Sequence, residues 1–263
     1  MDATMVIAAA LQKVYHPQDT LDDYEIFIQE QGPLSGIDLM VCPPSSSMYF
    51  SSFEEYLTYH RSLAKRYKCM LAPGIFCKDN YNTALLISHG GDIIHHQHQT
   101  HLSRREFIEG LKRGSELEVA DTPVGKIGFM IYSDCFYPQV GRILGLQGAD
   151  LIIAFYRQPA PYNKWLQLSG VWQQVQHNQF FAVEAGFNGV ISSQEYEAET
   201  IIHHPLWEKG DNGCLKKIEI KQKGIIQAKL DSEKRKEIKE TFPIYKYLNR
   251  TLYQKEWGKH ENS

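Results

Sequence analysis

Residues 125–131, with the sequence Gly-Lys-Ile-Gly-Phe-Met-Ile, decide the fold class. A short apolar run bounded by glycine is typical of a buried β-strand. Pro138 then opens an amphipathic stretch, as proline often does at the first position of a helix. A second apolar run follows at residues 151–155. Strand, helix and strand in succession predict an α/β protein.

The same alternation extends outward along the chain. Short apolar runs predict further strands at residues 5–11, 37–42, 69–71, 83–88, 92–99, 180–185, 200–204, 215–221 and 225–230. Helices are expected at residues 20–31, 51–67, 103–112, 163–176 and 231–240. Ser103, followed three residues later by Glu106, forms the pattern of a capping box. Periodicity alone leaves open a single wound sheet or two sheets packed face to face.

Composition excludes several classes of protein. The chain has 263 residues, of which 43% are hydrophobic and 22% charged, and its net charge is −3. A nucleic-acid-binding protein would show a basic imbalance, and a membrane span needs about 20 consecutive apolar residues; neither is present in the sequence. Five cysteines without paired spacing predict reduced thiols and a cytoplasmic location. We expect one domain at 1–241 and a C-terminal arm at 242–263.

A set of motifs in a fixed order resembles the carbon–nitrogen hydrolase (nitrilase) superfamily. They are residues 38–43, residues 82–87, Thr100-His101-Leu102, residues 125–131 with Asp134, Pro138 and Arg142, residues 147–150, Asn178-Gln179, and residues 200–205. The resemblance extends over nearly the whole chain. It implies a single-domain, four-layer α-β-β-α sandwich, which in this family commonly dimerises through the helical face near the nucleophile helix.

The resemblance also implies a glutamate base, a lysine for the oxyanion and a cysteine nucleophile. These three positions correspond here to Pro44, Gln99 and Tyr132. A supporting glutamate of the family corresponds to Glu106. Proline has no basic side chain, a glutamine amide has no charge, and a tyrosine hydroxyl with a pKa near 10 is a poor nucleophile at neutral pH. Aligning Cys135 with the nucleophile would need a three-residue shift that breaks the motifs on both sides.

Two functional hypotheses follow from this mapping. The first is a catalytically inactive pseudoenzyme that acts as a binding, scaffolding or regulatory subunit. It would form a homodimer and pair with an active homologue or a pathway enzyme. The alternative is a repurposed enzyme that uses a residual pocket of Gln99, Glu106, Tyr132, Asp134 and nearby histidines. That enzyme would perform non-thiol chemistry on a small amide- or amine-containing metabolite. A third hypothesis is conventional amidase activity with Cys135 or Cys42 as a displaced nucleophile.

Histidines are concentrated in one segment, at positions 89, 95, 96, 98 and 101. On a strand, His96 and His98 share a face, which is the start of a two-ligand metal site. A solvated hairpin that carries polar histidines is the simpler interpretation, so we predict no metal and no cofactor. Trp165 and Trp172 are seven residues apart on one expected helix and share a face, for which we expect core packing. The aromatic C-terminal arm is expected to pack on the body or across a dimer.

Overall fold

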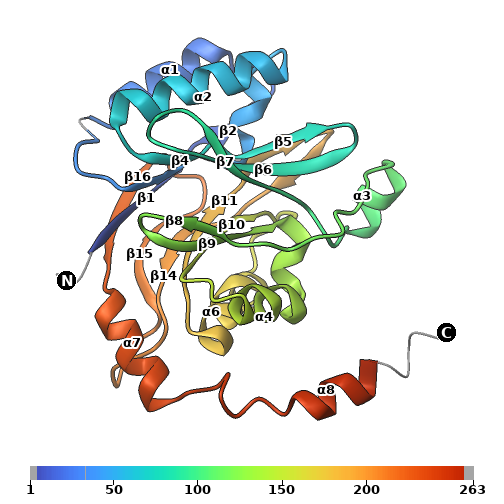
Figure 1. The fold of residues 1–263 in the computed structure, drawn as a ribbon. Coiled ribbons are helices and arrows are strands. Elements are labelled where there is room, and N and C mark those ends of the chain that lie inside the picture. Colours follow the sequence, from blue (N-terminus) through green and yellow to red (C-terminus); the bar gives the residue numbers. More distant parts are fainter. Residues whose placement is uncertain (1–4, 33, 258–263) are drawn as a thin grey trace.

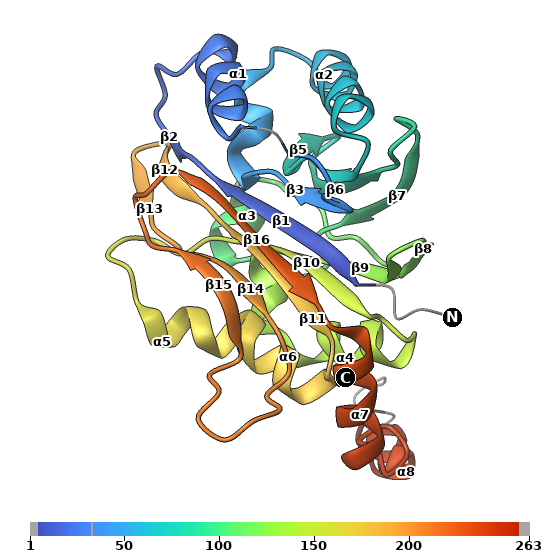
Figure 2. The same ribbon diagram turned by 90° about the vertical axis from the view of Figure 1, so that its left-hand side faces the viewer.

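The computed structural model describes residues 5–32 and 34–257. Two β-sheets pack face to face, and helices cover the outer face of each sheet (Figure 1). Helices α1 (Leu21–Glu30) and α2 (Phe53–Tyr67) cover the first sheet, and α4 (Pro138–Leu146) and α6 (Gln173–Asn178) cover the second (Figure 2). This arrangement confirms the four-layer α-β-β-α sandwich and decides against a single wound sheet.

The first sheet is built around the N-terminal strand. Its path is β16 (Gly224–Leu230), β1 (Val6–Gln12), β3 (Leu39–Val41), β4 (Met70–Ala72), β6 (Tyr81–Ile87) and β5 (Ile75–Lys78), and β7 (Ile93–His98) also pairs with β6. Strands β1, β3 and β4 are parallel, whereas β16 joins antiparallel to β1. The predicted hairpin near residues 83–99 is confirmed as the antiparallel pair β6–β7.

The second sheet contains the stretch that decided the fold class. Its path is β15 (Cys214–Ile218), β14 (Thr200–His203), β11 (Phe181–Gly186), β10 (Leu151–Tyr156), β9 (Gly125–Ile131) and β8 (Ala120–Thr122). Strands β9, β10 and β11 are parallel, as strands joined by helical crossovers should be. A small third sheet of β13 (Gln194–Tyr196), β12 (Asn188–Ile191) and β2 (Val14–Tyr15) was not predicted.

Side-chain alternation along the strands separates three hydrophobic cores. In β1, Ala8 packs in the core between the two sheets, while its neighbour Ala9 packs against α1 and α2. In β9, Phe129 likewise lies between the sheets, and Met130 lies in the core under α4 and α6. Because both faces of these strands are buried, they appear in the sequence as continuous apolar runs.

Capping residues set the helix starts, including the one predicted at Ser103. Thr20 and Ser103 each form a capping box, with Asp23 and Glu106 respectively, and Ser52 caps α2. The helix that Ser103 opens, α3 (Arg104–Ile108), ends earlier than expected. Its terminus is followed by Gly110, whose φ of 83° lies in the left-handed region that ends helices.

The helix expected at residues 163–176 is divided by a π-helical turn. Its parts are α5 (Lys164–Gln167), the π segment η3 (Leu168–Trp172) and α6. Gly170 breaks the helical path with φ −87° and ψ −107°. The prediction that both tryptophans pack in the core is wrong for Trp165, because this residue is 76% exposed.

The C-terminal segment runs along the second helical layer (Figure 1). Helix α7 (Ser232–Thr241) is followed by α8 (Arg250–Trp257). Between them, the Tyr245 hydroxyl donates to the carbonyl of Asn178 at 2.9 Å, and the Gln179 amide donates to the carbonyl of Phe242 at 2.9 Å. Residues 258–263 of the predicted arm lie outside the described residues. No helix in the described part of the chain has the length and apolarity to span a bilayer.

Candidate functional site

The candidate site lies where β9 ends. The chain passes directly from β9 into the 3₁₀ turn η2 (Tyr132–Phe136), and Tyr132 has a φ of 48°. A left-handed conformation is costly for a non-glycine residue and persists only where surrounding contacts hold it. The Tyr132 ring is 4% exposed and packs in the core between the two sheets.

Asp134 holds this turn. Its buried carboxylate accepts hydrogen bonds from the backbone amides of Thr100, His101 and Ile131, at 2.7 to 3.3 Å. The Thr100 hydroxyl donates to it at 2.8 Å. Charged acceptors make stronger hydrogen bonds than neutral ones. Asp134 therefore fixes the strained turn against the loop that follows β7.

Glu106 is the centre of a second buried network. Its carboxylate pairs with Nη2 of Arg157 at 2.5 Å, and its Oε2 accepts from the Ser103 amide at 2.7 Å. Oε2 also accepts from the Gln99 amide at 3.2 Å and from the Ser133 hydroxyl at 3.1 Å. The carboxylate predicted as an inherited support is thus held by four partners.

Gln99 has its hydrogen-bonding groups engaged in the same network. Its Oε1 accepts from the Asn82 amide at 2.7 Å. Its Nε2 lies 2.7 Å from the carbonyl of His101, in addition to its contact with Glu106. Gln99 is fully buried, so these contacts satisfy groups that have lost access to water.

Arg157 was not predicted as a site residue, and it connects Tyr132 with Glu106. It follows β10 and places its guanidinium carbon 3.9 Å from the centroid of the Tyr132 ring. The same group lies 5.5 Å from the Tyr196 ring. A guanidinium over an aromatic face is a favourable cation–π arrangement. Arg157 therefore contacts both the Tyr132 ring and the Glu106 carboxylate.

The environment sets the protonation of Glu106 and Tyr132. Burial alone would raise the pKa of Glu106, but the charge of Arg157 and the hydrogen bonds from Ser103 and Gln99 together lower it. Burial raises the pKa of Tyr132 to about 12, although the charge of Arg157 acts in the opposite direction. At neutral pH the centre therefore contains a carboxylate, a guanidinium and an un-ionised phenol.

Arg157 contacts both Tyr132 and Glu106, Glu106 bonds to Gln99, and Asp134 bonds to the amide of Thr100 beside Gln99; the residual pocket of these residues stays a prediction. Pro44 begins the buried 3₁₀ turn η1 (Pro44–Tyr49), which follows β3 of the first sheet. In this turn, Ser47 donates its hydroxyl to the carbonyl of Ile75 at 2.5 Å. The position at which the resemblance expects a base is thus part of a packed turn.

The two cysteines considered as displaced nucleophiles lie in other cores. Cys135 is fully buried among residues under α4 and α6, and Cys42 is fully buried under α1 and α2. Burial raises the pKa of the Cys42 thiol to about 12 and raises the pKa of Cys135 well above its usual range. Because the thiolate is the reactive form, both cysteines are poor nucleophiles in this environment.

The histidines of the β6–β7 hairpin make separate contacts. His98 forms a hydrogen bond with the Thr83 hydroxyl at 2.9 Å and stacks on Tyr81. His96 lies 5.7 Å from His98, measured between ring centroids. Within residues 5–32 and 34–257, no group of three or more histidine, cysteine, aspartate or glutamate side chains is arranged to hold a metal ion.

The layered fold and the polar centre at the end of β9 define a nitrilase-type α-β-β-α protein. The family model for carbon–nitrogen hydrolases matches residues 6–239. The chain therefore belongs to the carbon–nitrogen hydrolase family.

Solved structures share this fold. A carbon–nitrogen hydrolase from Helicobacter pylori aligns with a TM-score of 0.77 and 18% identity, over 96% of this chain and 98% of that one. The Caenorhabditis elegans NitFhit protein aligns with a TM-score of 0.79 and 17% identity, over 96% of this chain and 67% of that one. At these identities the likeness shows the fold alone.

Curated relatives match over shorter stretches. A protein described as a probable nitrilase of Schizosaccharomyces pombe is 34% identical over 86 residues, which are 32% of this chain and 30% of that protein. An apolipoprotein N-acyltransferase of Geobacter metallireducens is 24% identical over 177 residues, 56% of this chain and 34% of that protein. The chain thus spans about a third of the length of these relatives.

Proposed function

We propose that this chain is a catalytically inactive member of its family that acts as a binding, scaffolding or regulatory subunit. The observation that carries the proposal is the buried Tyr132 ring, which stands where the resemblance expects the nucleophile and lies beneath the Arg157 guanidinium. A thiol-dependent hydrolase needs a thiolate, a base and a cation around an accessible reacting carbon. Here Pro44, Gln99 and Tyr132 offer none of these groups.

The contacts of the centre also support this proposal over the repurposed enzyme. A phenol whose pKa is raised to about 12 donates or accepts a proton poorly at neutral pH. His101, two residues after Gln99, stacks on Tyr137 and forms a hydrogen bond with Asp134. Its ring nitrogen is thus directed to the turn-holding carboxylate.

The direct test is turnover by the purified chain against a broad panel of amides, nitriles and carbamoyl compounds. We expect wild type and Cys135→Ala to give the same rate as buffer alone, while an active family member run in parallel turns over. Turnover by the wild type that Cys135→Ala abolishes would overturn the proposal. Turnover that Glu106→Gln and Tyr132→Phe abolish, with Cys135→Ala unaffected, would support the repurposed enzyme instead.

We also propose that the chain forms a homodimer through the layer of α4, α6 and α8. Leu146 on α4 is 48% exposed, and Leu252 and Tyr253 on α8 are 52% and 47% exposed. Exposed apolar side chains that gather on one face are typical of an interface. Residues 242–263 would then act as an arm that extends this face beyond the domain at 1–241.

Light scattering on the purified protein tests the dimer. We expect a dimer for the wild type and for Ile26→Glu, and a monomer for Leu146→Glu. Ile26 is the matched control because it is 53% exposed on α1, in the opposite helical layer (Figure 2). A monomeric wild type, or a dimer that Leu146→Glu leaves intact, would contradict this interface.

The partner and the location belong to the same proposal. An active homologue or a pathway enzyme is the expected partner, and affinity capture from the native host tests this directly. All five cysteines are free in the structure, which supports a reducing, cytoplasmic location.

A further inference from the structure

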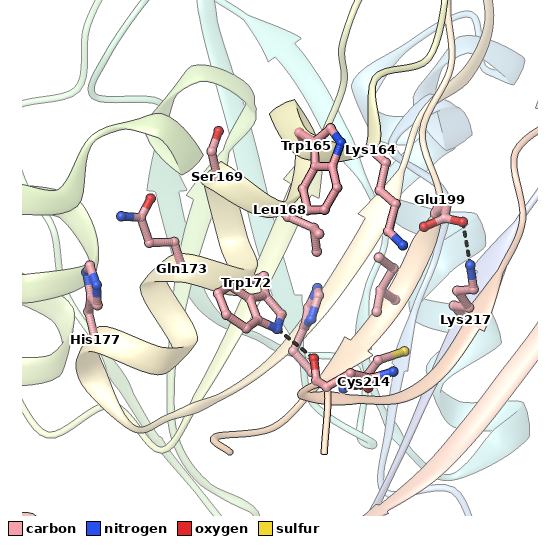
Figure 3. Close-up of a pocket in the computed structure, with 13 residues that line it drawn as sticks. Lys164, Trp165, Leu168, Ser169, Trp172, Gln173, His177, Glu199, Cys214 and Lys217 are labelled. Carbon is pink, nitrogen blue, oxygen red and sulfur yellow. Dashed lines mark hydrogen bonds and ion pairs between the residues drawn. The ribbon is translucent and has the colours of Figure 1, made fainter. Parts of the chain in front are cut away.

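A cavity of about 600 Å³ lies between the α5–η3–α6 segment and strands β14 and β15 (Figure 3). This volume is in the range that holds a small molecule. Trp165, Trp172 and Leu168 form its helical wall, and Ile201 and His203 form its floor on β14. The cavity shares no lining residue with the Tyr132 centre.

The floor contains a buried polar atom without a protein partner. His203 Nε2 lies 2.6 Å from Oε2 of Glu184, and both side chains are at most 1% exposed. Gln167 donates its amide to the other Glu184 oxygen at 2.9 Å. The other ring nitrogen, His203 Nδ1, has no hydrogen-bond partner in the described part of the chain. Buried polar atoms are nearly always paired, so this nitrogen indicates a partner from outside the protein.

The pairing of His203 with the buried Glu184 carboxylate leaves one ring nitrogen for a ligand. A carboxylate taken out of water is stable only beside a compensating charge. Of the two side chains that bond to Glu184, His203 alone can carry a positive charge. The imidazole faces Glu184 through Nε2, which leaves Nδ1 to hydrogen-bond a polar group of a ligand.

The remaining wall charges favour an anion. Glu199 is the only carboxylate among the described residues of the wall, and it is paired with Lys217 at 2.7 Å (Figure 3). Lys164 enters the wall from α5 and has no ion-pair partner in the part of the chain that the structure describes. The unpaired charge that faces a ligand is therefore positive.

The aromatic wall favours a flat ligand. Trp172 is fixed by a hydrogen bond from its indole nitrogen to the carbonyl of Asn212 at 2.8 Å. Trp165 is 76% exposed, and Figure 3 shows it on the same side of the cavity as Lys164. Stacking a ligand ring on the Trp165 indole would remove apolar surface from water. The wall also contains η3, where the helical path breaks at Gly170.

We propose that this cavity binds a small planar aromatic carboxylate. The ring stacks on Trp165, the carboxylate accepts a hydrogen bond from His203 Nδ1, and Lys164 attracts the charge at the mouth. The site is independent of the Tyr132 centre, so it holds whether or not that centre is active.

Calorimetry on the full chain tests the proposal, with naphthalene-2-acetate as the probe and naphthalene-2-ethanol as its neutral analogue. We expect saturable binding of the acid at one site per chain, and binding of the alcohol weaker by about tenfold, which corresponds to one lost charged hydrogen bond. Trp165→Ala should weaken binding of the acid by about tenfold, and Lys164→Ala by about threefold. Lys216→Ala is the matched control, because Lys216 is exposed and its neighbour Lys217 is the one that lines the cavity.

His203 is tested by a measurement that leaves the fold intact. In protein labelled with ¹⁵N-histidine, the Nδ1 resonance of His203 should shift as the acid saturates the site. Absence of saturable binding, equal affinity for the acid and the alcohol, or an unmoved His203 resonance would each overturn the proposal. A Trp165→Ala variant that binds as wild type and melts at the same temperature would also overturn it.

Discussion

The Tyr132 centre and the cavity beneath α5 and α6 are two polar regions of one sandwich, and they differ in how their hydrogen bonds are satisfied. Glu106 has four partners, and the buried Tyr132 ring lies against Arg157. In the cavity, His203 forms part of the floor, and its buried Nδ1 has no hydrogen-bond partner within the described residues. A satisfied network stabilises the fold, whereas an unsatisfied one beside a cavity favours ligand binding. Substitutions in the Tyr132 centre should therefore mainly lower stability, and substitutions in the cavity should mainly weaken ligand binding.

The largest effect is expected from Arg157→Ala. Removing the guanidinium leaves the buried Glu106 carboxylate without its counter-charge, and breaking a buried ion pair in this way costs about 3–5 kcal/mol. The free energy of unfolding, measured in urea, should fall by about that amount. Arg105, which lies next to Glu106 in the sequence, pairs with Glu109 on the surface, so Arg105→Ala should leave the free energy of unfolding nearly unchanged. Equal losses for the two variants would show that the buried Arg157–Glu106 pair contributes no more to stability than a surface pair.

Asp134→Ala should have the next largest effect. The substitution leaves the amides of Thr100 and His101 without their charged acceptor at the strained turn of Tyr132. Hydrogen bonds to charged groups contribute about 1.5–3 kcal/mol, and we expect a loss of stability in that range. Asp121→Ala is the control, because the Asp121 side chain is 84% exposed. A loss of under about 0.5 kcal/mol for Asp134→Ala would show that the turn does not depend on this carboxylate.

The pH dependence of stability should identify Glu106. Its pKa is lowered in the folded protein, because Arg157 and the hydrogen-bond donors outweigh the effect of burial. The ionised form then contributes stability that is fully present above the unfolded pKa of about 4.3 and is lost as pH falls through the folded pKa. The stability difference between wild type and Glu106→Gln should therefore be constant above about pH 5 and shrink in more acidic solution. A difference that grows with acidity would contradict the direction of the shift.

The smallest effect on stability is expected in the cavity. Trp165 is 76% exposed, so Trp165→Ala should change the free energy of unfolding by less than about 0.5 kcal/mol. The same variant is expected to lose most of its affinity for the aromatic acid. A large loss of stability would mean that Trp165 supports the fold, and the cavity would then resemble the Tyr132 centre.

Local rules predicted much of this molecule. Apolar runs marked the buried strands, and Thr20 and Ser103 marked helix starts, because these signals depend on residues a few positions apart. The π turn at Gly170 escaped prediction, since an isolated glycine is tolerated in a regular helix. Arg157 escaped it because its contact with Glu106 joins residues 51 positions apart, which only the tertiary fold brings together.

The candidate site was predicted only in part, because some of its contacts leave no local signal in the sequence. Gln99, Glu106, Tyr132 and Asp134 carried a signal because they stand in or beside family motifs. The contact of Glu184 with His203 carried none, because it depends on the antiparallel pairing of β11 with β14. Trp165 and Trp172, seven residues apart, could have indicated the cavity. We interpreted their spacing as core packing, but both residues line the cavity wall.

Intact-protein mass spectrometry tests the central claim, that the family's nucleophile position is occupied by an unreactive side chain. The chain is incubated with the panel of amides, nitriles and carbamoyl compounds, quenched in acid, and examined for a covalent acyl-enzyme. We expect the chain to keep its unmodified mass with every compound, while an active family member treated in parallel accumulates a covalent adduct. A stoichiometric adduct on Tyr132 or Cys135, located by peptide sequencing and lost in Tyr132→Phe or Cys135→Ala, would contradict it.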